Sequence, residues 1–94
     1  MYIKVTWIHN FDDEPVLFYH ELDDARMETR KIEFFKDETF QWASAHHYSD
    51  DIYLAEIPFP SVDEINEDPE FIAKEISQDE FEQIWIEYAH SANG

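Results

Sequence analysis

The sequence has no cysteine, and its only glycine is the last of its 94 residues. Without cysteine there is no disulfide framework, thiol nucleophile or cysteine-based zinc site. Without internal glycine there is no Gly-rich phosphate loop, no Gly-x-Ser-x-Gly elbow and no sharp turn for a calcium loop. The longest apolar run, residues 16–19, is too short to span a membrane, and the N-terminus does not resemble a secretory signal. We therefore expect a cytoplasmic protein without a membrane anchor.

Basic residues are also scarce, with six Lys or Arg against 23 Asp or Glu and a formal net charge of −17. The imbalance is strongest in residues 51–94, where Lys74 is the only basic residue against 12 acidic ones. Solubility asks for a charge of only about 2–8 in a small domain. Such a field repels nucleic acid and anionic membranes and attracts cationic proteins. The charge therefore predicts a basic protein partner, with solubility alone as the simpler alternative.

The aromatic content of 17% is typical of a folded chain, and the length predicts a single domain over residues 1–94. Alternating apolar residues and short polar turns predict five strands. Because consecutive strands are joined by short turns, we expect an antiparallel meander of four to five strands over residues 1–57. The second strand is apolar on both faces and is expected at the centre. The predicted strands are residues 2–9, 16–22, 26–36, 39–45 and 52–57.

Residues 58–94 are predicted to be helical. Residues 61–64 and 77–80 both have the Ser-x-x-Glu form of a capping box, and Pro69 limits the first, short helix. The second helix has one apolar face and is expected to pack on one face of the sheet, which gives an α+β fold. That apolar face consists of Phe81, Ile84, Trp85, Tyr88 and Ala89.

Several segments, in this order and spacing, resemble a family of small acidic single-domain bacterial proteins known only as a domain of unknown function. The resemblance implies a compact domain and no catalytic residue. Relatives have glycine in the turn that Asp37 and Glu38 form here. The segments are Tyr2-Ile3-Lys4-Val5 with Trp7 and His9, Glu14-Pro15-Val16, Glu21-Leu22-Asp23, residues 26–33, residues 56–60, Asp68-Pro69-Glu70-Phe71, Glu75-Ile76-Ser77, Glu80-Phe81-Glu82 and Trp85.

The five histidines and many carboxylates do not form a recognisable reactive motif. His46 and His47 are adjacent and would point to opposite faces of an extended segment. His9 and His20 are expected on paired strands but roughly 16 Å apart, which is too far for a shared ion. We therefore predict no metal, no cofactor and no catalytic residue, and we expect that the protein is not an enzyme.

The third predicted strand carries alternating charges. Arg26, Glu28 and Arg30 are expected on one face, with Lys31 and Glu33 on the other. An anion site built from the two arginines is conceivable, but in so acidic a chain we expect them to pair across strands with residues such as Glu21.

One apolar residue of the last helix, Ile86, lies outside its apolar face and among acidic neighbours. An apolar centre with a charged rim is typical of a protein-binding patch. The sequence therefore predicts an inhibitor or immunity protein that neutralises a basic partner, such as a toxin nuclease. The alternatives are a DNA mimic that occupies DNA-binding proteins and, with less support, a small metal-dependent enzyme. The predicted partner-binding residues are Asp79, Glu82, Ile86 and Glu87, flanked by Asp63, Glu67 and Glu70.

Overall fold

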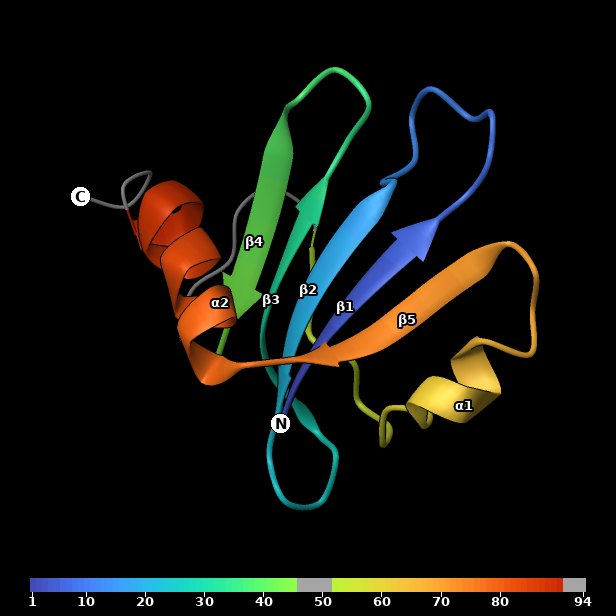
Figure 1. Cartoon of the computed structure of the whole chain (residues 1–94). Helices are drawn as coiled ribbons and strands as arrows, with labels where there is room; N and C mark the ends of the chain where they lie inside the picture. Colours follow the sequence, from blue (N-terminus) through green and yellow to red (C-terminus); the bar gives the residue numbers. More distant parts are fainter. Residues whose placement is uncertain (46–51, 91–94) are drawn as a thin grey trace.

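A computed structural model describes residues 1–45 and 52–90 of the chain, with the side chains of residues up to 89. The fold is a five-stranded antiparallel sheet of order β4-β3-β2-β1-β5 with helical segments at its faces (Figure 1). His46 and His47 lie outside the described residues. The elements are β1 (Tyr2–Trp7), β2 (Leu17–Leu22), β3 (Glu28–Phe34), β4 (Phe40–Ser44), α1 (Val62–Ile65), β5 (Phe71–Ile76), α2 (Gln78–Ile84) and η1 (Trp85–His90).

The first four strands form the predicted meander, and β2 is the central strand of the sheet. The prediction that the second strand is central is confirmed. The apolar residues on both faces of β2 suit this position, because a central strand is covered on both sides. The turn between β3 and β4 contains Glu38 with a φ of 71°, the left-handed region that favours glycine.

The fifth strand is not where the alternation predicts it. Residues 52–57 have no regular structure, and the fifth strand is Phe71–Ile76, between the two helices. β5 pairs with β1 along its whole length, from Tyr2 opposite Ile76 to Trp7 opposite Phe71. The prediction was wrong because the free edge of β1, a long-range partner, makes residues 71–76 a strand. The C-terminal part is therefore not purely helical.

Both predicted capping boxes begin helices. The hydroxyl of Ser61 accepts from the Glu64 amide at 3.1 Å, and that of Ser77 accepts from the Glu80 amide at 3.1 Å. The first helix ends at Ile65, before Pro69. The second is α-helical over Gln78–Ile84 and continues as the π-helical turn η1.

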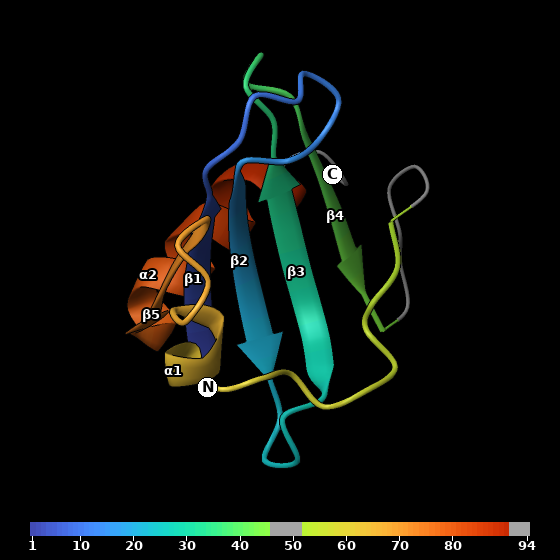
Figure 2. The same ribbon diagram turned by 90° about the vertical axis from the view of Figure 1, so that its right-hand side faces the viewer.

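The sheet separates two hydrophobic clusters. On one face, Phe81 and Ala89 of the C-terminal helix share a cluster with Tyr19, Ile32 and Trp42. On the other face, Ile3, Val5, Leu22 and Ala73 form a second cluster. Val62 and Ile65 of α1 and Phe59 of the preceding segment pack against that second cluster. Figure 2 looks onto this second face, with α2 behind the sheet and residues 52–60 crossing towards α1.

A β-bulge reverses the predicted direction of one side chain. Arg30 pairs with Glu21, but Glu28 pairs with the next residue, Leu22, so Thr29 is the extra residue of β3. Glu28 therefore lies with Lys31 on the face of the sheet that α1 covers, which we call the α1 face. It does not lie beside Arg30, as the alternation predicts. Arg26 is also outside the strand, in the β2–β3 turn, with a φ of 63°.

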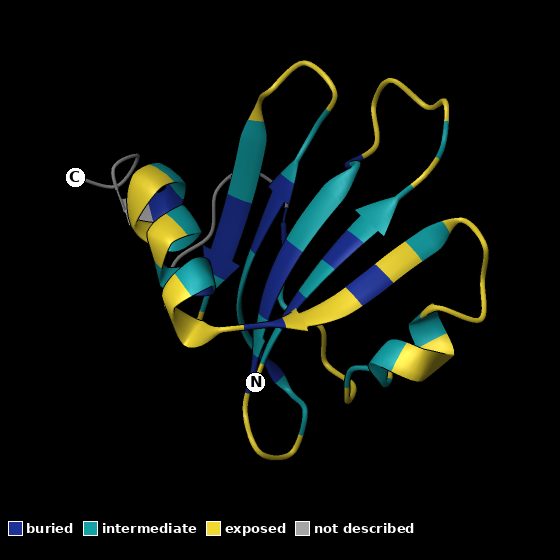
Figure 3. Cartoon of the chain, viewed as in Figure 1, coloured by how far each residue is buried: buried dark blue, intermediate teal, exposed yellow. Residues whose placement is uncertain are grey.

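The side chain of Asn66 covers the outer edge of β5. Its Nδ2 donates to the Ala73 carbonyl at 2.9 Å, and its Oδ1 accepts from the Ala73 amide at 2.7 Å. The side-chain carboxamide of Asn66 thus takes the place of a neighbouring strand at the middle of β5. This strand is exposed over much of its length (Figure 3).

We expect Asn66→Ala to lower the free energy of unfolding by about 1–3 kcal/mol, because both Ala73 groups lose their partner. It should also promote self-association, because the edge becomes free to pair. Urea denaturation and light scattering measure the two effects. The exposed neighbour Glu67, changed to Ala, is the control. Equal stability of the two variants would contradict this role for Asn66.

Candidate functional site

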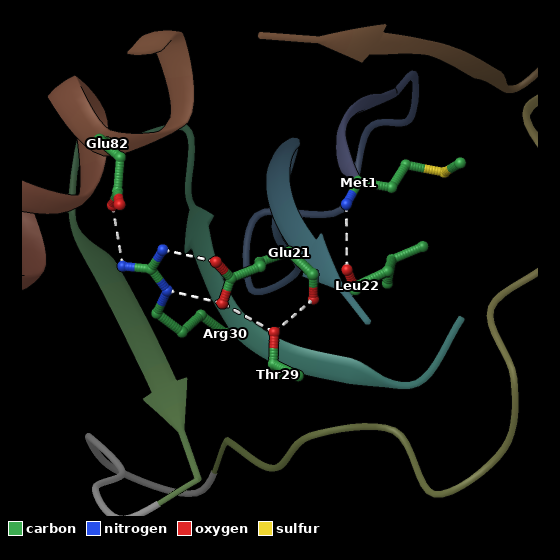
Figure 4. Close-up of polar contacts among 6 residues, drawn as sticks. All are labelled: Met1, Glu21, Leu22, Thr29, Arg30 and Glu82. Carbon is green, nitrogen blue, oxygen red and sulfur yellow. Dashed lines mark hydrogen bonds and ion pairs between the residues drawn. The ribbon is translucent and has the colours of Figure 1, made fainter. Parts of the chain in front are cut away.

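Arg30 connects the sheet with the C-terminal helix (Figure 4). Its Nε and Nη2 donate to the two carboxylate oxygens of Glu21 at 2.8 and 2.6 Å, and its Nη1 donates to Glu82 Oε1 at 2.9 Å. The guanidinium also lies over the rings of Phe81 and Trp85, at 4.9 and 5.0 Å from their centres. The predicted cross-strand pairing with Glu21 is confirmed for Arg30, whereas the same expectation for Arg26 was wrong, because Arg26 lies in a turn and donates to backbone carbonyls.

Other cations are also engaged within the chain. Lys31 Nζ lies 3.6 Å from carboxylate oxygens of both Glu28 and Glu33. Arg26 donates to the backbone carbonyls of Phe59 and Pro60 at 2.8 and 2.7 Å. The two arginines therefore do not form an anion site. Because these cations serve internal contacts, little positive charge offsets the carboxylates on the exterior.

Three of the four predicted partner-binding residues on the C-terminal helix are exposed, and the fourth, Glu82, is half-buried. Ile86 exposes 57% of its surface, and Asp79 and Glu87 are exposed. Glu82 is half-buried and pairs with Arg30. It therefore has a structural role that the sequence did not indicate. We call Asp79, Ile86 and Glu87 the helix patch.

The other predicted acids lie at the opposite face of the sheet. Asp63 is in α1, Glu67 and Glu70 follow it, and all three are exposed. Because α1 and α2 pack on opposite faces, these acids do not extend the helix patch into one continuous surface. We call them the α1 acids.

The α1 face also contains a pocket of about 460 Å³ that the sequence did not indicate. Its lining residues come from residues 52–60 (the crossing segment) and α1, and from β1, β2, β3 and the start of β5. Figure 2 shows how these elements are arranged on this face of the sheet. A mainly apolar cavity with a few converging polar groups is the usual form of a small-molecule site. Its apolar lining is Val5, Phe18, Ala55, Phe59, Pro60, Ile65 and Phe71, and its polar lining is His20, Glu28, Lys31, Glu33, Glu64 and Asp68.

A buried His–Glu pair lies at the floor of this pocket. His20 Nδ1 lies 2.5 Å from Glu28 Oε2, and the two side chains expose 9% and 2% of their surface. The other oxygen of Glu28 accepts from the Ala55 amide at 2.9 Å. The imidazole is flanked by the rings of Phe18 and Phe59, at 5.8 and 4.5 Å between ring centres. Two strands and the crossing segment thus hold the pair in place.

The surroundings of Glu28 determine its protonation. Burial raises the pKa of Glu28, but the hydrogen bond and charge interaction with His20, the hydrogen bond from the Ala55 amide and the charge of Lys31 lower the pKa below its ordinary value. Glu28 is therefore a carboxylate at neutral pH and accepts the proton of His20 Nδ1. In the neutral imidazole, Nε2 is then a hydrogen-bond acceptor. Nε2 makes no hydrogen bond within the part of the chain that the structure describes.

His9, the other histidine whose side chain the structure describes, makes different contacts. The ring of His9 contacts the Pro15 carbonyl at 2.7 Å through Nε2 and accepts from the Phe11 amide through Nδ1. Both ring nitrogens are therefore used by the β1–β2 loop. Across residues 1–45 and 52–90, no group of three or more His, Asp or Glu side chains is placed to hold a metal ion.

The chain is thus a small, strongly acidic α+β protein with a buried His–Glu pair in an apolar pocket. Residues 1–90 match a family described as "Domain of unknown function (DUF6881)", and the chain belongs to that family. The comparisons found no similar protein with a curated description and no similar solved structure. In the described residues, no helix combines the length and apolar character needed to span a membrane.

Proposed function

We propose that this protein is an acidic binding module that neutralises a basic protein in the cytoplasm. The partner class we propose is a bacterial toxin, such as a nuclease, for which the chain would be the immunity protein or inhibitor. A nuclease site is basic because it holds phosphates, so an acidic domain can cover it. The proposal includes no catalytic activity.

The observation that supports this function is the internal use of the cations. Arg30 is held between Glu21 and Glu82, Lys31 lies beside Glu28 and Glu33, and Arg26 bonds the backbone. The exposed carboxylates of a chain with net charge −17 therefore act on the surroundings with little compensation. Such a field accelerates association with a basic protein.

The helix patch supplies the apolar contact that charge alone lacks. An exposed Ile86 between the acids Asp79 and Glu87 resembles the apolar centre and polar rim of an interface. The α1 acids, on the other face, would act at longer range as a steering charge. We therefore expect the two groups to differ in effect, with the helix patch controlling dissociation and the α1 acids controlling association.

A pull-down with tagged protein from a bacterial lysate, at about 50 and 300 mM salt, tests the proposal. We expect one stoichiometric basic protein at both salt concentrations. The patch variant Asp79→Ser, Ile86→Ser, Glu87→Gln should lower its affinity at least about tenfold. Glu82 stays unchanged in this variant because its ion pair with Arg30 stabilises the fold.

The matched control is Asp13→Ser, Ile57→Ser, Glu14→Gln, which makes the same types of change at exposed positions elsewhere. Equal binding by the patch variant and the control would contradict the helix patch as the interface. Capture of several DNA-binding proteins at about 50 mM salt only would favour the DNA-mimic alternative. Capture of no protein at either concentration would contradict a binding module.

A further inference from the structure

We propose that the pocket on the α1 face is a binding site for a small organic cation with an apolar, preferably aromatic, body. The inference does not depend on the proposed protein partner, because the pocket and the helix patch lie on opposite faces of the sheet. It rests on three properties of the pocket: its size and apolar walls, its charge, and the open nitrogen of His20.

The walls suit an apolar body. The pocket has a volume of about 460 Å³, within the range of about 300–1,000 Å³ that small-molecule sites occupy. Phe18, Phe59 and Phe71 line it from three different segments of the chain. Aromatic faces attract cations as well as apolar groups, so this lining is compatible with a positively charged ligand.

The charge of the pocket selects the sign of the ligand. Glu28, Glu33, Glu64 and Asp68 line it against the single cation Lys31. Lys31 Nζ lies 3.6 Å from carboxylate oxygens of both Glu28 and Glu33. It therefore does not neutralise the other two acids, Glu64 and Asp68. A bound anion would be repelled by this negative surplus, whereas a cation would reduce it.

His20 provides the polar contact. It exposes 7% of its surface, lines the pocket and uses Nδ1 for Glu28, which leaves Nε2 as an acceptor in the neutral imidazole. Because Nε2 has no hydrogen-bond partner among the described residues, a donating ligand in the pocket can bind it. An ammonium or amidinium group has the required N–H donors. The Glu28 carboxylate maintains the orientation of the ring, as carboxylates do for histidines at metal and catalytic sites.

Three matched probes test the charge preference at a pH of about 8, where an alkylammonium group keeps its charge. They share a naphthyl body and differ in charge: naphthylethylamine, naphthylethanol and naphthylacetate. Titration followed by NMR should give a Kd of about 1 mM or below for the amine. The alcohol should bind about tenfold more weakly, and the acetate should not bind. Shifts should be confined to pocket residues and to the His20 ring nitrogens. Equal binding of amine and alcohol, or tighter binding of the acetate, would overturn the proposal.

Two substitutions in the pocket are expected to act in opposite directions. Glu28→Gln removes one charge and, by donating its amide N–H to Nδ1, moves the imidazole proton to Nε2. It should weaken amine binding at least tenfold, and the ¹⁵N shifts of His20 report the change of tautomer. Lys31→Met removes the competing cation and should tighten amine binding severalfold. The control Glu87→Gln makes the same charge change at an exposed position on the other face and should leave Kd unchanged.

An equal loss of affinity in Glu28→Gln and Glu87→Gln would show that only the overall field attracts the amine, and would refute the pocket. If Glu28→Gln does not fold, Lys31→Met decides, and unchanged or weaker amine binding by that variant refutes the proposal. A capped arginine amide distinguishes a free ligand from a protein side chain as the source of the cation. Tighter binding of this amide than of the amine would contradict a site for a small aromatic cation.

Discussion

Phe81→Ala should lower the free energy of unfolding by about 3–5 kcal/mol, as large-to-small changes of a buried aromatic residue do. Phe81 is completely buried, and its ring lies 5.1 Å from that of Tyr2 and 6.0 Å from that of Trp85. A domain of this size has a total stability of about 5–14 kcal/mol. The variant should therefore lose about a quarter or more of its stability and unfold about 15 °C or more below the wild type.

Two measurements localise the effect of this change. Calorimetry gives the loss of stability, and hydrogen exchange should show the largest loss of protection in α2, because Phe81 is its fully buried residue. Ile86→Ala is the matched control on the same helix. Because Ile86 is 57% exposed, its truncation should change stability by no more than about 0.5 kcal/mol. Similar losses for the two variants would contradict Phe81 as the anchor of the helix.

Arg30→Met should destabilise the protein by about 2–4 kcal/mol at pH 7. Methionine keeps an apolar chain over Phe81 and Trp85 but leaves the carboxylates of Glu21 and Glu82 without their cation. Removing one partner of a buried pair costs more than the pair contributes, because the remaining charge stays desolvated. We place the effect below that of a fully buried pair, since these side chains are 19–34% exposed.

The matched control is Lys36→Met, which removes the same charge from a pair 4.0 Å long with the fully exposed Asp12. Its effect should not exceed about 1 kcal/mol. Chemical denaturation measures both variants at the same salt concentration. An Arg30→Met variant as stable as Lys36→Met would show that the ion pairs of Arg30 contribute no more than those of a surface lysine.

The cost of Arg30→Met should depend on pH in a defined direction. The hydrogen bonds from Arg30 lower the pKa of Glu21 below its ordinary value of 4.5. A group with a lowered folded-state pKa contributes stability above its unfolded pKa and loses it as the pH falls through the folded value. The difference in stability between wild type and variant should therefore shrink below about pH 4.5. A difference that stays constant to pH 3, about 1.5 units lower, would contradict the pairing.

The parts of the fold that depend on neighbouring residues could be predicted from the sequence. The capping boxes at Ser61 and Ser77 begin helices, because their hydrogen bonds span only three residues. The four strands of the meander follow from alternation and short turns. The pairing of Arg30 with Glu21 also follows, since their strands are joined by a single turn.

The parts that depend on distant residues could not be predicted. β5 exists because Phe71–Ile76 meets the free edge of β1, and nothing in those six residues indicates that edge. The bulge at Thr29 turns Glu28 to the other face, where it meets His20. A strict alternation places Glu28 beside Arg30, so the buried His–Glu pair had no signal in the sequence.

The candidate sites divide in the same way. Composition alone determined the acidity of the chain, and local periodicity determined that Ile86 lies off the apolar face of its helix. Only the tertiary structure showed that Glu82 serves Arg30, that the α1 acids lie on the opposite face, and that a pocket forms around His20. The reason is physical: periodicity sets which side of an element a residue occupies, whereas the packing of segments far apart in the chain decides what lies opposite it.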